Sequence, residues 1–357
     1  MTVESSTENL PSDSSTVTTK PGAFDPSWQL AITVEYYFRY AVLAIGVVGT
    51  AANALVMYAL ISHHNARETK KRAINLLIIN QNLIDLVSCV LLLIGVCIQI
   101  TSTRIYLTGA IGYFLCVMFI HDTGAYCALY GSTINLVFVT IERYLKVVHP
   151  FWSKRSLKRW MIFAAMAFAW AGGIASAAIP VAFLHLDFED GFCTMTTSSD
   201  EQGWIYGSCN FAILFLCPLT IFVYCYGRMV VVMRRQMHAL AGHGVEGPAQ
   251  PSSASQAQSK RVKWNIVKTM IIVSIAFVVS WFPHTIYFVM VALWVQSGYL
   301  MVGYFPTVFL IYLNTCLNPF IYAAKHEGVR HQLARMMVCR KRNAVEDAPQ
   351  NRTAAGT

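Results

Sequence analysis

The sequence is poor in charge: 13% of its 357 residues are Asp, Glu, Lys or Arg, whereas 55% are hydrophobic. A soluble domain usually carries about twice that charged share. None of the ten cysteines forms a CxxC pair, so the usual zinc and redox spacings are missing. No HExxH or GxSxG motif supports a membrane enzyme. No basic run is interleaved with aromatics in a polar segment, so nucleic acid is not an expected partner.

Instead, the chain has seven long apolar runs, and each has the roughly 20 residues that a membrane-spanning helix needs. The runs lie at 38–62, 74–100, 111–146, 159–183, 204–233, 264–294 and 301–324. The predicted fold class is therefore an all-α membrane protein, a seven-transmembrane helix bundle. After the seventh run, Val329, Leu333 and Met336 recur at helical spacing among Arg and His. This pattern predicts a short amphipathic helix on the membrane surface.

The predicted organisation has four parts. Residues 1–34 are Ser/Thr-rich and are expected to form a disordered extracellular tail. Residues 35–325 form the membrane domain, 326–339 the surface helix, and 340–357 a disordered cytoplasmic tail.

Basic residues predict the orientation, because they stay on the cytoplasmic side. Of the 27 Lys and Arg, all except Lys20, Arg39 and Arg104 lie at or after the ends of the odd-numbered runs. We therefore expect an extracellular N-terminus. Acids gather before the first run and between the fourth and fifth runs. They could steer a cationic ligand, although a solvated loop surface explains most of them equally.

Ionisable groups at membrane depth tend to mark function. Asp85 lies in the middle of the second run and needs a proton or a partner. The candidate partners are Asn53, Ser132, Asn314 and Asn318. Two interpretations stay open at this point: a polar cluster that joins helices, and a cation site or switch.

A second polar pair, His121 and Asp122, lies near the outer end of the third run. Either it reaches water at the rim or it contacts a ligand. Tyr126 follows Asp122 by one helical turn and shares its face.

An ordered set of motifs runs along these segments. In chain order it comprises Asn53, Asp85 in LIDL, Glu142-Arg143-Tyr144, Pro150 in LKVVHP, Trp170, Phe215, Pro218, Tyr226, FVVSWFP from Phe277 through Trp281 to Pro283, and NPFIY from Asn318 to Tyr322. Over residues 35–340 the chain thus resembles the rhodopsin-like (class A) G-protein-coupled receptors. The resemblance implies a plasma-membrane receptor, not an enzyme, that binds an extracellular ligand and activates a heterotrimeric G protein by outward movement of helix six. It also implies arrestin, receptor kinase and membrane lipids as partners.

The resemblance assigns roles to individual residues. Activation and G-protein coupling fall to Glu142, Arg143, Tyr144, Phe151, Tyr226, Phe277, Trp281, Asn318, Pro319 and Tyr322. An allosteric sodium ion, the one cofactor-like group implied, falls to Asp85, Ser132, Asn314 and Asn318. A disulfide is implied between Cys116 and Cys193. Cys339 is expected to carry palmitate, although a free cytosolic thiol is a serious alternative.

Some positions depart from the family pattern. Cys116 lies about two residues farther from Arg143 than usual, so the outer part of the third helix is hard to align. Lys263 stands where some relatives carry an acid that pairs with the Arg, so that second ion pair is not expected. Ser280 replaces the usual Cys before Trp281.

The ligand class follows less directly. A light receptor would carry a lysine where this chain has Tyr312, and an amine receptor would carry an aspartate near Ala125 or Thr123. A neuropeptide-type receptor fits better, because the outer face is acidic and the end of helix six is aromatic and polar. The expected pocket residues are Asp122, Tyr126, Trp281, His284, Tyr287, Phe288 and Tyr312. The alternatives are an amine or lipid ligand and, as a different class, a transporter or channel, for which we find neither repeats nor charged rings.

Overall fold

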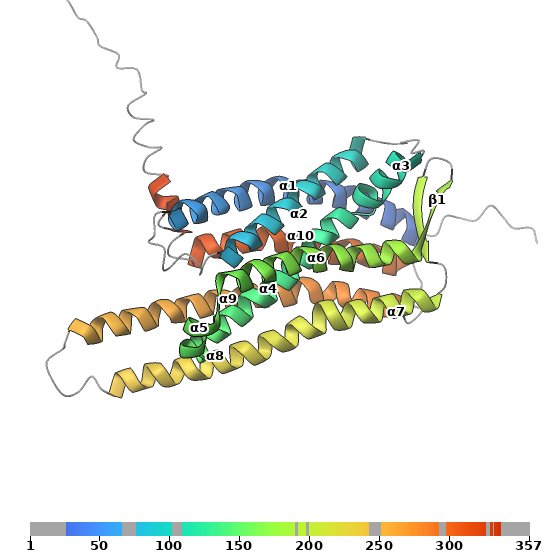
Figure 1. Ribbon diagram of the computed structural model, residues 1–357. Helices are drawn as coiled ribbons and strands as arrows, with labels where there is room; N and C mark the ends of the chain where they lie inside the picture. Colours follow the sequence, from blue (N-terminus) through green and yellow to red (C-terminus); the bar gives the residue numbers. More distant parts are fainter. Residues whose placement is uncertain are drawn as a thin grey trace, which may run out of the picture.

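The computed structural model describes residues 26–65, 76–101, 109–189, 192–197, 200–242, 251–292, 298–325, 329–330 and 332–336. Over these residues the chain is a bundle of long, roughly parallel helices (Figure 1). Seven helical segments are long and apolar enough to cross a membrane. This finding confirms the predicted seven-transmembrane bundle. The spans are Gln29–Ser62, Leu76–Thr101, Thr123–Val148, Arg159–Ile179, Gly207–His238, Arg261–Met290 and Val302–Lys325.

Every span except the fifth lies within one helix; in five of the crossings that helix is the only piece, whereas the third crossing has two shorter pieces before its span. The single helices are α1 (Pro26–Asn65), α2 (Leu76–Thr101), α6 (Arg159–Phe183), α9 (Pro251–Ala292) and α10 (Gly298–Lys325). The third crossing comprises α3 (Gly109–Leu115), the π-helical η2 (Cys116–Ile120) and α4 (Thr123–Val148). The fifth comprises α7 (Asp200–Asn210), the π-helical η3 (Phe211–Leu216) and α8 (Cys217–Gly242). The short helix α5 (Pro150–Ser156) follows α4.

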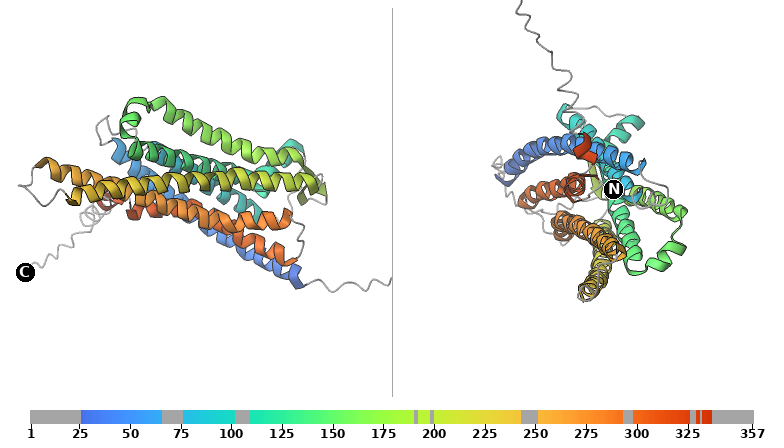
Figure 2. Two further views of the ribbon diagram at one scale, coloured as in Figure 1. Left: turned by 90° about the horizontal axis from the view of Figure 1, so that it is seen from below. Right: turned by 90° about the vertical axis from the view of Figure 1, so that its left-hand side faces the viewer.

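A two-stranded hairpin adds to the predicted all-helical architecture. Strand β1 (Leu184–Glu189) pairs antiparallel with β2 (Phe192–Thr197), with Leu184 opposite Thr197. The hairpin lies at the end of the bundle where α1 begins (Figure 1). Helix α10 finishes at the opposite end of the bundle, so the first and last helices of the membrane domain begin and finish on opposite sides (Figure 2).

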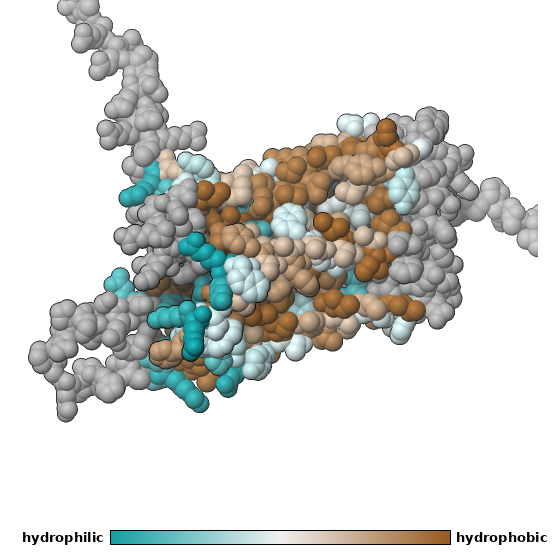
Figure 3. All heavy atoms as spheres, in the orientation of Figure 1, coloured by the Kyte–Doolittle hydropathy of each residue, from teal (hydrophilic) through white to brown (hydrophobic). Residues whose placement is uncertain are grey.

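The core is built around α4, whose span is 67% buried, against 22% for the span in α6. Small residues let these two helices approach closely. A Cβ atom added to Gly173 of α6 would lie 2.6 Å from the backbone nitrogen of Gly131 in α4. The outer surface is apolar around the middle of the bundle, and hydrophilic side chains gather near the end where α5 lies (Figure 3). This is the pattern of a helical bundle in lipid.

An irregular backbone in the outer part of the third crossing explains why the segment between Cys116 and Arg143 is longer than usual. After the π-helical η2, the backbone of Asp122 adopts the left-handed conformation, with φ of 53°, before α4 begins. A π-helix holds more residues per turn than an α-helix, and the bend then redirects the chain. Together they accommodate the extra residues that separate Cys116 from Arg143.

Both ends of the chain meet the predicted boundaries only in part. Helix α1 begins at Pro26, inside the segment 1–34 that the sequence assigns to the tail. Beyond α10, residues 329–330 and 332–336 are helical and Val329 is buried. The surface helix at 326–339 remains a prediction, because several of its residues, Cys339 included, lie outside the described part.

Candidate functional site

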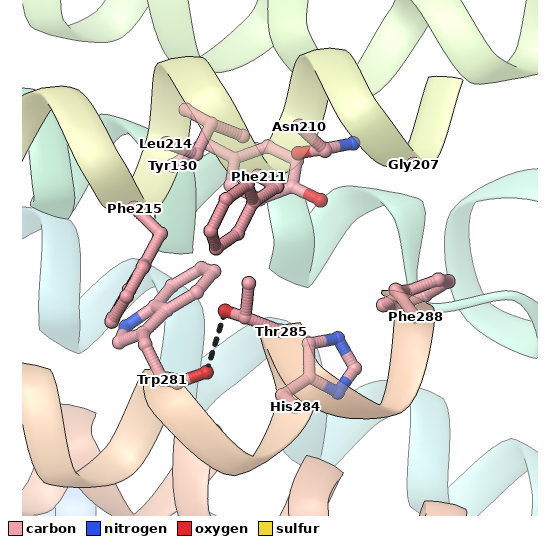
Figure 4. Close-up of a pocket in the computed structure, with 10 residues that line it drawn as sticks. All are labelled: Tyr130, Gly207, Asn210, Phe211, Leu214, Phe215, Trp281, His284, Thr285 and Phe288. Carbon is pink, nitrogen blue, oxygen red and sulfur yellow. Dashed lines mark hydrogen bonds between the residues drawn. The ribbon is translucent and has the colours of Figure 1, made fainter. Parts of the chain in front are cut away.

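A pocket opens among the outer parts of α4, α7, η3 and α9 (Figure 4). It is lined by Tyr130, Gly207, Asn210, Phe211, Leu214, Phe215, Trp281, His284, Thr285 and Phe288. Trp281 is buried, with its ring centroid 6.0 Å from that of Tyr130 and 5.6 Å from that of Phe277. Its indole Nε1 has no hydrogen-bond partner among the described residues. The site is therefore mainly aromatic, with a few polar atoms available to orient a bound group.

Aromatic residues continue from this pocket toward α10. His284 packs edge-on against Phe288, with centroids 4.8 Å apart, and its Nδ1 lies 3.2 Å from Thr307 Oγ1. Tyr287 lies 5.2 Å from Tyr304, centroid to centroid. Of the predicted residues of helix six, His284 and Tyr287 thus contact α10, and Trp281, His284 and Phe288 line the pocket itself.

Asp122 forms a neighbouring cluster with α10. The hydroxyl of Tyr312 donates to Asp122 Oδ2 at 2.8 Å. The ring of Tyr126 lies 6.3 Å from that of Tyr312, and the ring of Phe38 lies 6.5 Å from it. The carboxylate is therefore held between helices three and seven, and a cationic group of a ligand would have to share it with Tyr312.

Sequence reasoning missed the pocket wall that comes from the fifth crossing. Asn210, Phe211 and Leu214 lie there, at and within the π-helical η3. A π-helix shifts the positions that face inward, so the 3.6-residue period does not identify them. Tyr130 was also missed, although it follows Tyr126 by four residues and shares its helix face.

Asp85 is fully buried in the centre of the bundle, and the side chains that donate to it within the described residues are neutral. Ser132 Oγ donates to its Oδ1 at 2.8 Å, and Asn318 Nδ2 donates to its Oδ2 at 2.8 Å. Gln81 Nε2 lies 3.4 and 3.5 Å from the two carboxylate oxygens. The Oδ1 atoms of Asn314 and Asn318 are buried and unpartnered among the described residues. Unpartnered amide oxygens would suit a hard cation, whereas the Gln81 N–H group, which faces the carboxylate, would not.

The cytoplasmic end of α4 carries a buried charge pair. Arg143 Nε lies 3.3 Å from Glu142 Oε2, and both side chains are almost fully buried. Glu142 also forms an ion pair with Lys146. The hydroxyl of Tyr226 lies 2.9 Å from Thr140 Oγ1 and accepts from Ser274 Oγ at 3.1 Å, which joins α4, α8 and α9.

The remaining predicted residues at this end differ in exposure. The hydroxyl of Tyr322 is buried without a hydrogen-bond partner among the described residues. Phe151 on α5 is 87% exposed, the highest value among the large hydrophobic side chains of the described residues. Tyr144 packs beside Tyr224 of α8, with ring centroids 5.9 Å apart.

The predicted disulfide is not settled by these contacts. Cys116 is fully buried and is not among the free cysteines of the described residues. The side chain of Cys193 in β2 lies outside the described side chains, so the Cys116–Cys193 bridge stays a prediction.

Residues 52–322 match the sequence profile of the 7 transmembrane receptor (rhodopsin family). The chain is 26% identical to Melanopsin-B of Gadus morhua over 316 residues, which cover 85% of this chain and 48% of that protein. It is 27% identical to Galanin receptor type 1 of Rattus norvegicus over 331 residues, covering 88% of this chain and 86% of the receptor. Allatostatin-A receptor of Bombyx mori is 26% identical over 315 residues, 83% of this chain and 78% of that receptor. The chain thus spans less than half the length of Melanopsin-B and most of the other two.

Proposed function

Because the chain belongs to the rhodopsin family of seven-transmembrane receptors, we propose that it binds an extracellular peptide and activates a heterotrimeric G protein at the plasma membrane. It is a multi-pass membrane receptor rather than an enzyme. The observation that carries the proposal is the buried Glu142–Arg143 pair at the cytoplasmic end of α4, next to the exposed Phe151. A buried charge in a membrane helix is energetically unfavourable, so it tends to mark a functional site.

The charge pair supports an activation mechanism. Glu142 holds Arg143 against α4, and the Tyr226 hydroxyl joins α4 to α8 and α9. In the proposed step, the cytoplasmic end of α9 moves outward and Tyr226 loses its bond to Ser274. Arg143 then leaves Glu142 and contacts the G protein, while Phe151 enters an apolar recess of that partner. Tyr322 has a hydroxyl free to bond in the rearranged bundle.

The pocket supports the ligand class. Trp281 lies at the base of the pocket. Its ring packs against Phe277, which in turn packs against Phe222 and Phe215 of the fifth crossing. An aromatic or aliphatic side chain of a peptide would fill this space and press on Trp281. Relatives named for galanin and allatostatin-A support a peptide over an amine or lipid. Tyr312, rather than a lysine, also speaks against a light receptor.

Finer expectations about partners belong to the same proposal. Arrestin and a receptor kinase would use the cytoplasmic face, where basic residues would also meet anionic lipid. The resemblance also implies a sodium ion at Asp85 with Ser132, Asn314 and Asn318, but the Gln81 amide faces the same carboxylate, so sodium binding is not part of this proposal.

The test is nucleotide exchange on a panel of G proteins in membranes from cells that express the receptor, challenged with peptide, amine and lipid libraries. We expect a peptide to stimulate exchange and Arg143→Ala to lower it by at least about tenfold at equal surface expression. Arg155→Ala, on the exposed face of α5, is the matched control and should retain coupling. Unchanged exchange in Arg143→Ala would contradict the mechanism, and stimulation by amines or lipids alone would overturn the ligand class.

A further inference from the structure

We propose that the side-chain amide of Gln81 takes the place of a cation beside Asp85 and thereby makes the core of this receptor weakly responsive to sodium. The proposal concerns the buried Asp85 cluster and does not depend on the ligand class or on G-protein coupling. It rests on where the amide points, on what holds it there and on the burial of the whole set.

The Gln81 amide faces the acceptors that a cation would need. Its Nε2 lies 3.4 Å from Oδ1 and 3.5 Å from Oδ2 of Asp85, and it donates to Ser132 Oγ in a short hydrogen bond. Both distances to the carboxylate oxygens are near the upper limit for a hydrogen bond, but the amide nitrogen lies almost equally far from the two oxygens and so faces both of them. A sodium ion on this side of Asp85 would meet the positive end of the amide dipole instead of a lone pair.

A chain of hydrogen bonds fixes the direction of that amide. Trp170 Nε1 on α6 donates to Asn80 Oδ1 at 3.1 Å. Asn80 Nδ2 donates to Asn135 Oδ1 at 2.8 Å, and Asn135 Nδ2 donates to Gln81 Oε1 at 2.7 Å. Gln81 then donates toward Asp85, so the chain connects α6, α2 and α4.

The two ends of this chain allow one polarity only. The indole of Trp170 can donate but cannot accept, and an ionised carboxylate can accept but cannot donate. Each amide between them must therefore present its oxygen toward Trp170 and its nitrogen toward Asp85. Flipping Gln81 would place its N–H groups against those of Asn135 and lose the bond to Ser132. The orientation of the Gln81 N–H group that faces Asp85 is thus fixed by Trp170, which lies on a different helix.

Burial makes this arrangement hard to displace. Asn80, Gln81, Asp85 and Asn135 are each no more than 1% exposed. In a site of low dielectric constant, a satisfied hydrogen-bond network is strengthened, and an unpaired amide is unfavourable. A cation would have to break the Gln81 contacts with Asp85 and Ser132 without water to replace them. The spare oxygens of Asn314 and Asn318 would become useful only once that amide is gone.

The experiment measures the thermal unfolding of the purified full-length receptor while NaCl is replaced by KCl at constant ionic strength. A bound ion raises Tm according to its concentration and affinity. We expect the wild type to show the same Tm in both salts. Gln81→Met keeps the side-chain length but removes the donor, and its Tm should be about 2–4 °C higher in NaCl than in KCl. Adding Asp85→Asn to Gln81→Met should abolish that difference.

Two further variants keep the test decisive. Asn82→Leu removes a buried amide of the same helix whose nitrogen donates to the Ile78 carbonyl at 2.9 Å, so it should behave as the wild type does. Trp170→Phe removes the N–H group that orients the chain while keeping a ring, and it should give a smaller sodium response of the same sign. If Gln81→Met does not fold, Trp170→Phe decides the matter.

A sodium-specific rise in Tm in the wild type as large as that of the variants would overturn the proposal. So would folded Gln81→Met and Trp170→Phe proteins whose Tm is the same in both salts. Neither result would bear on nucleotide exchange, so the receptor function is tested separately.

Discussion

At the scale of single residues, each buried charge of the bundle is held by a specific neighbour. Asp85 has Ser132 and Asn318, Asp122 has Tyr312, and Glu142 is paired with Arg143. A lone charge at membrane depth is strongly unfavourable, so these partners stabilise the fold as well as any active state. The contacts differ in what they connect: the Asp122–Tyr312 bond joins two helices at the ligand end, whereas Glu142 and Arg143 are neighbours on α4.

Tyr312→Phe should therefore destabilise the receptor. It removes the hydroxyl that donates to Asp122 and leaves a carboxylate without that partner, which costs about 1–3 kcal/mol. We expect a lower Tm and lower surface expression. Asp122→Asn retains an oxygen that can accept from Tyr312 and should lose less. Thermal unfolding of both purified variants in one buffer checks this order, and an unchanged Tm in Tyr312→Phe would show that the bond contributes little.

Residues of the site were predictable where their type is unusual in an apolar run or where they belong to a motif. Asp85 and Asp122 stand out as acids in apolar runs, and Trp281 lies within an ordered motif. Gln81 was not predicted, because a neutral amide near the beginning of an apolar run looks like any other polar residue. Its role depends on Asn80, Asn135 and Trp170, whose contacts arise only when three helices pack together.

At the scale of elements, the number and approximate positions of the membrane spans were predictable from apolar length, whereas the exact helix ends and the irregular segments were not. The seven runs gave seven spans because length and hydrophobicity alone decide what crosses a bilayer. The π-helical η2 and the left-handed Asp122 interrupt the helical period without a proline, whereas η3 ends just before Pro218, which lacks the N–H that would bond to the Leu214 carbonyl. The segment of the β1–β2 hairpin was expected to be a loop, because its two short strands lie in a polar segment between the fourth and fifth apolar runs.

The contact between α4 and α6 gives a second prediction. Gly173→Val should lower Tm or prevent surface expression, because its Cβ would meet the backbone of Gly131 and Cys127, which cannot move aside as a side chain can. We expect a loss of roughly 1–3 kcal/mol or more, typical of overpacking. Gly227→Ala on α8 is the control, because no atom lies within 4 Å of a Cβ at that position. Equal expression and Tm in Gly173→Val and wild type would contradict the close approach.

At the scale of the whole molecule, the fold separates the proposed ligand end from the proposed coupling end. The hairpin and α7, which contributes residues to the pocket, lie at the end where α1 begins, and α5, which follows the Glu142–Arg143 pair in the chain, lies toward the end where α10 finishes (Figure 1). Between them, Trp281, Phe277, Phe222 and Tyr226 form an unbroken series of ring contacts. In the proposed mechanism, a movement at Trp281 would be passed to Tyr226 through these contacts, because close-packed rings cannot absorb it locally.

The last prediction concerns movement of α9 as a whole. Spin labels at Arg155 and Arg261, both exposed, would report the separation of α5 from the start of the sixth span. The exposed Cys97, Cys209 and Cys217 would first be replaced by serine. We expect nucleotide-free G protein to lengthen the distance by several ångströms, because outward movement of α9 uncovers Arg143. A pair at Arg155 and Ile61, on α5 and α1, should stay constant. A shift in both pairs would indicate a general loosening, and a constant Arg155–Arg261 distance in a complex that still exchanges nucleotide would rule out movement of α9 as the coupling step.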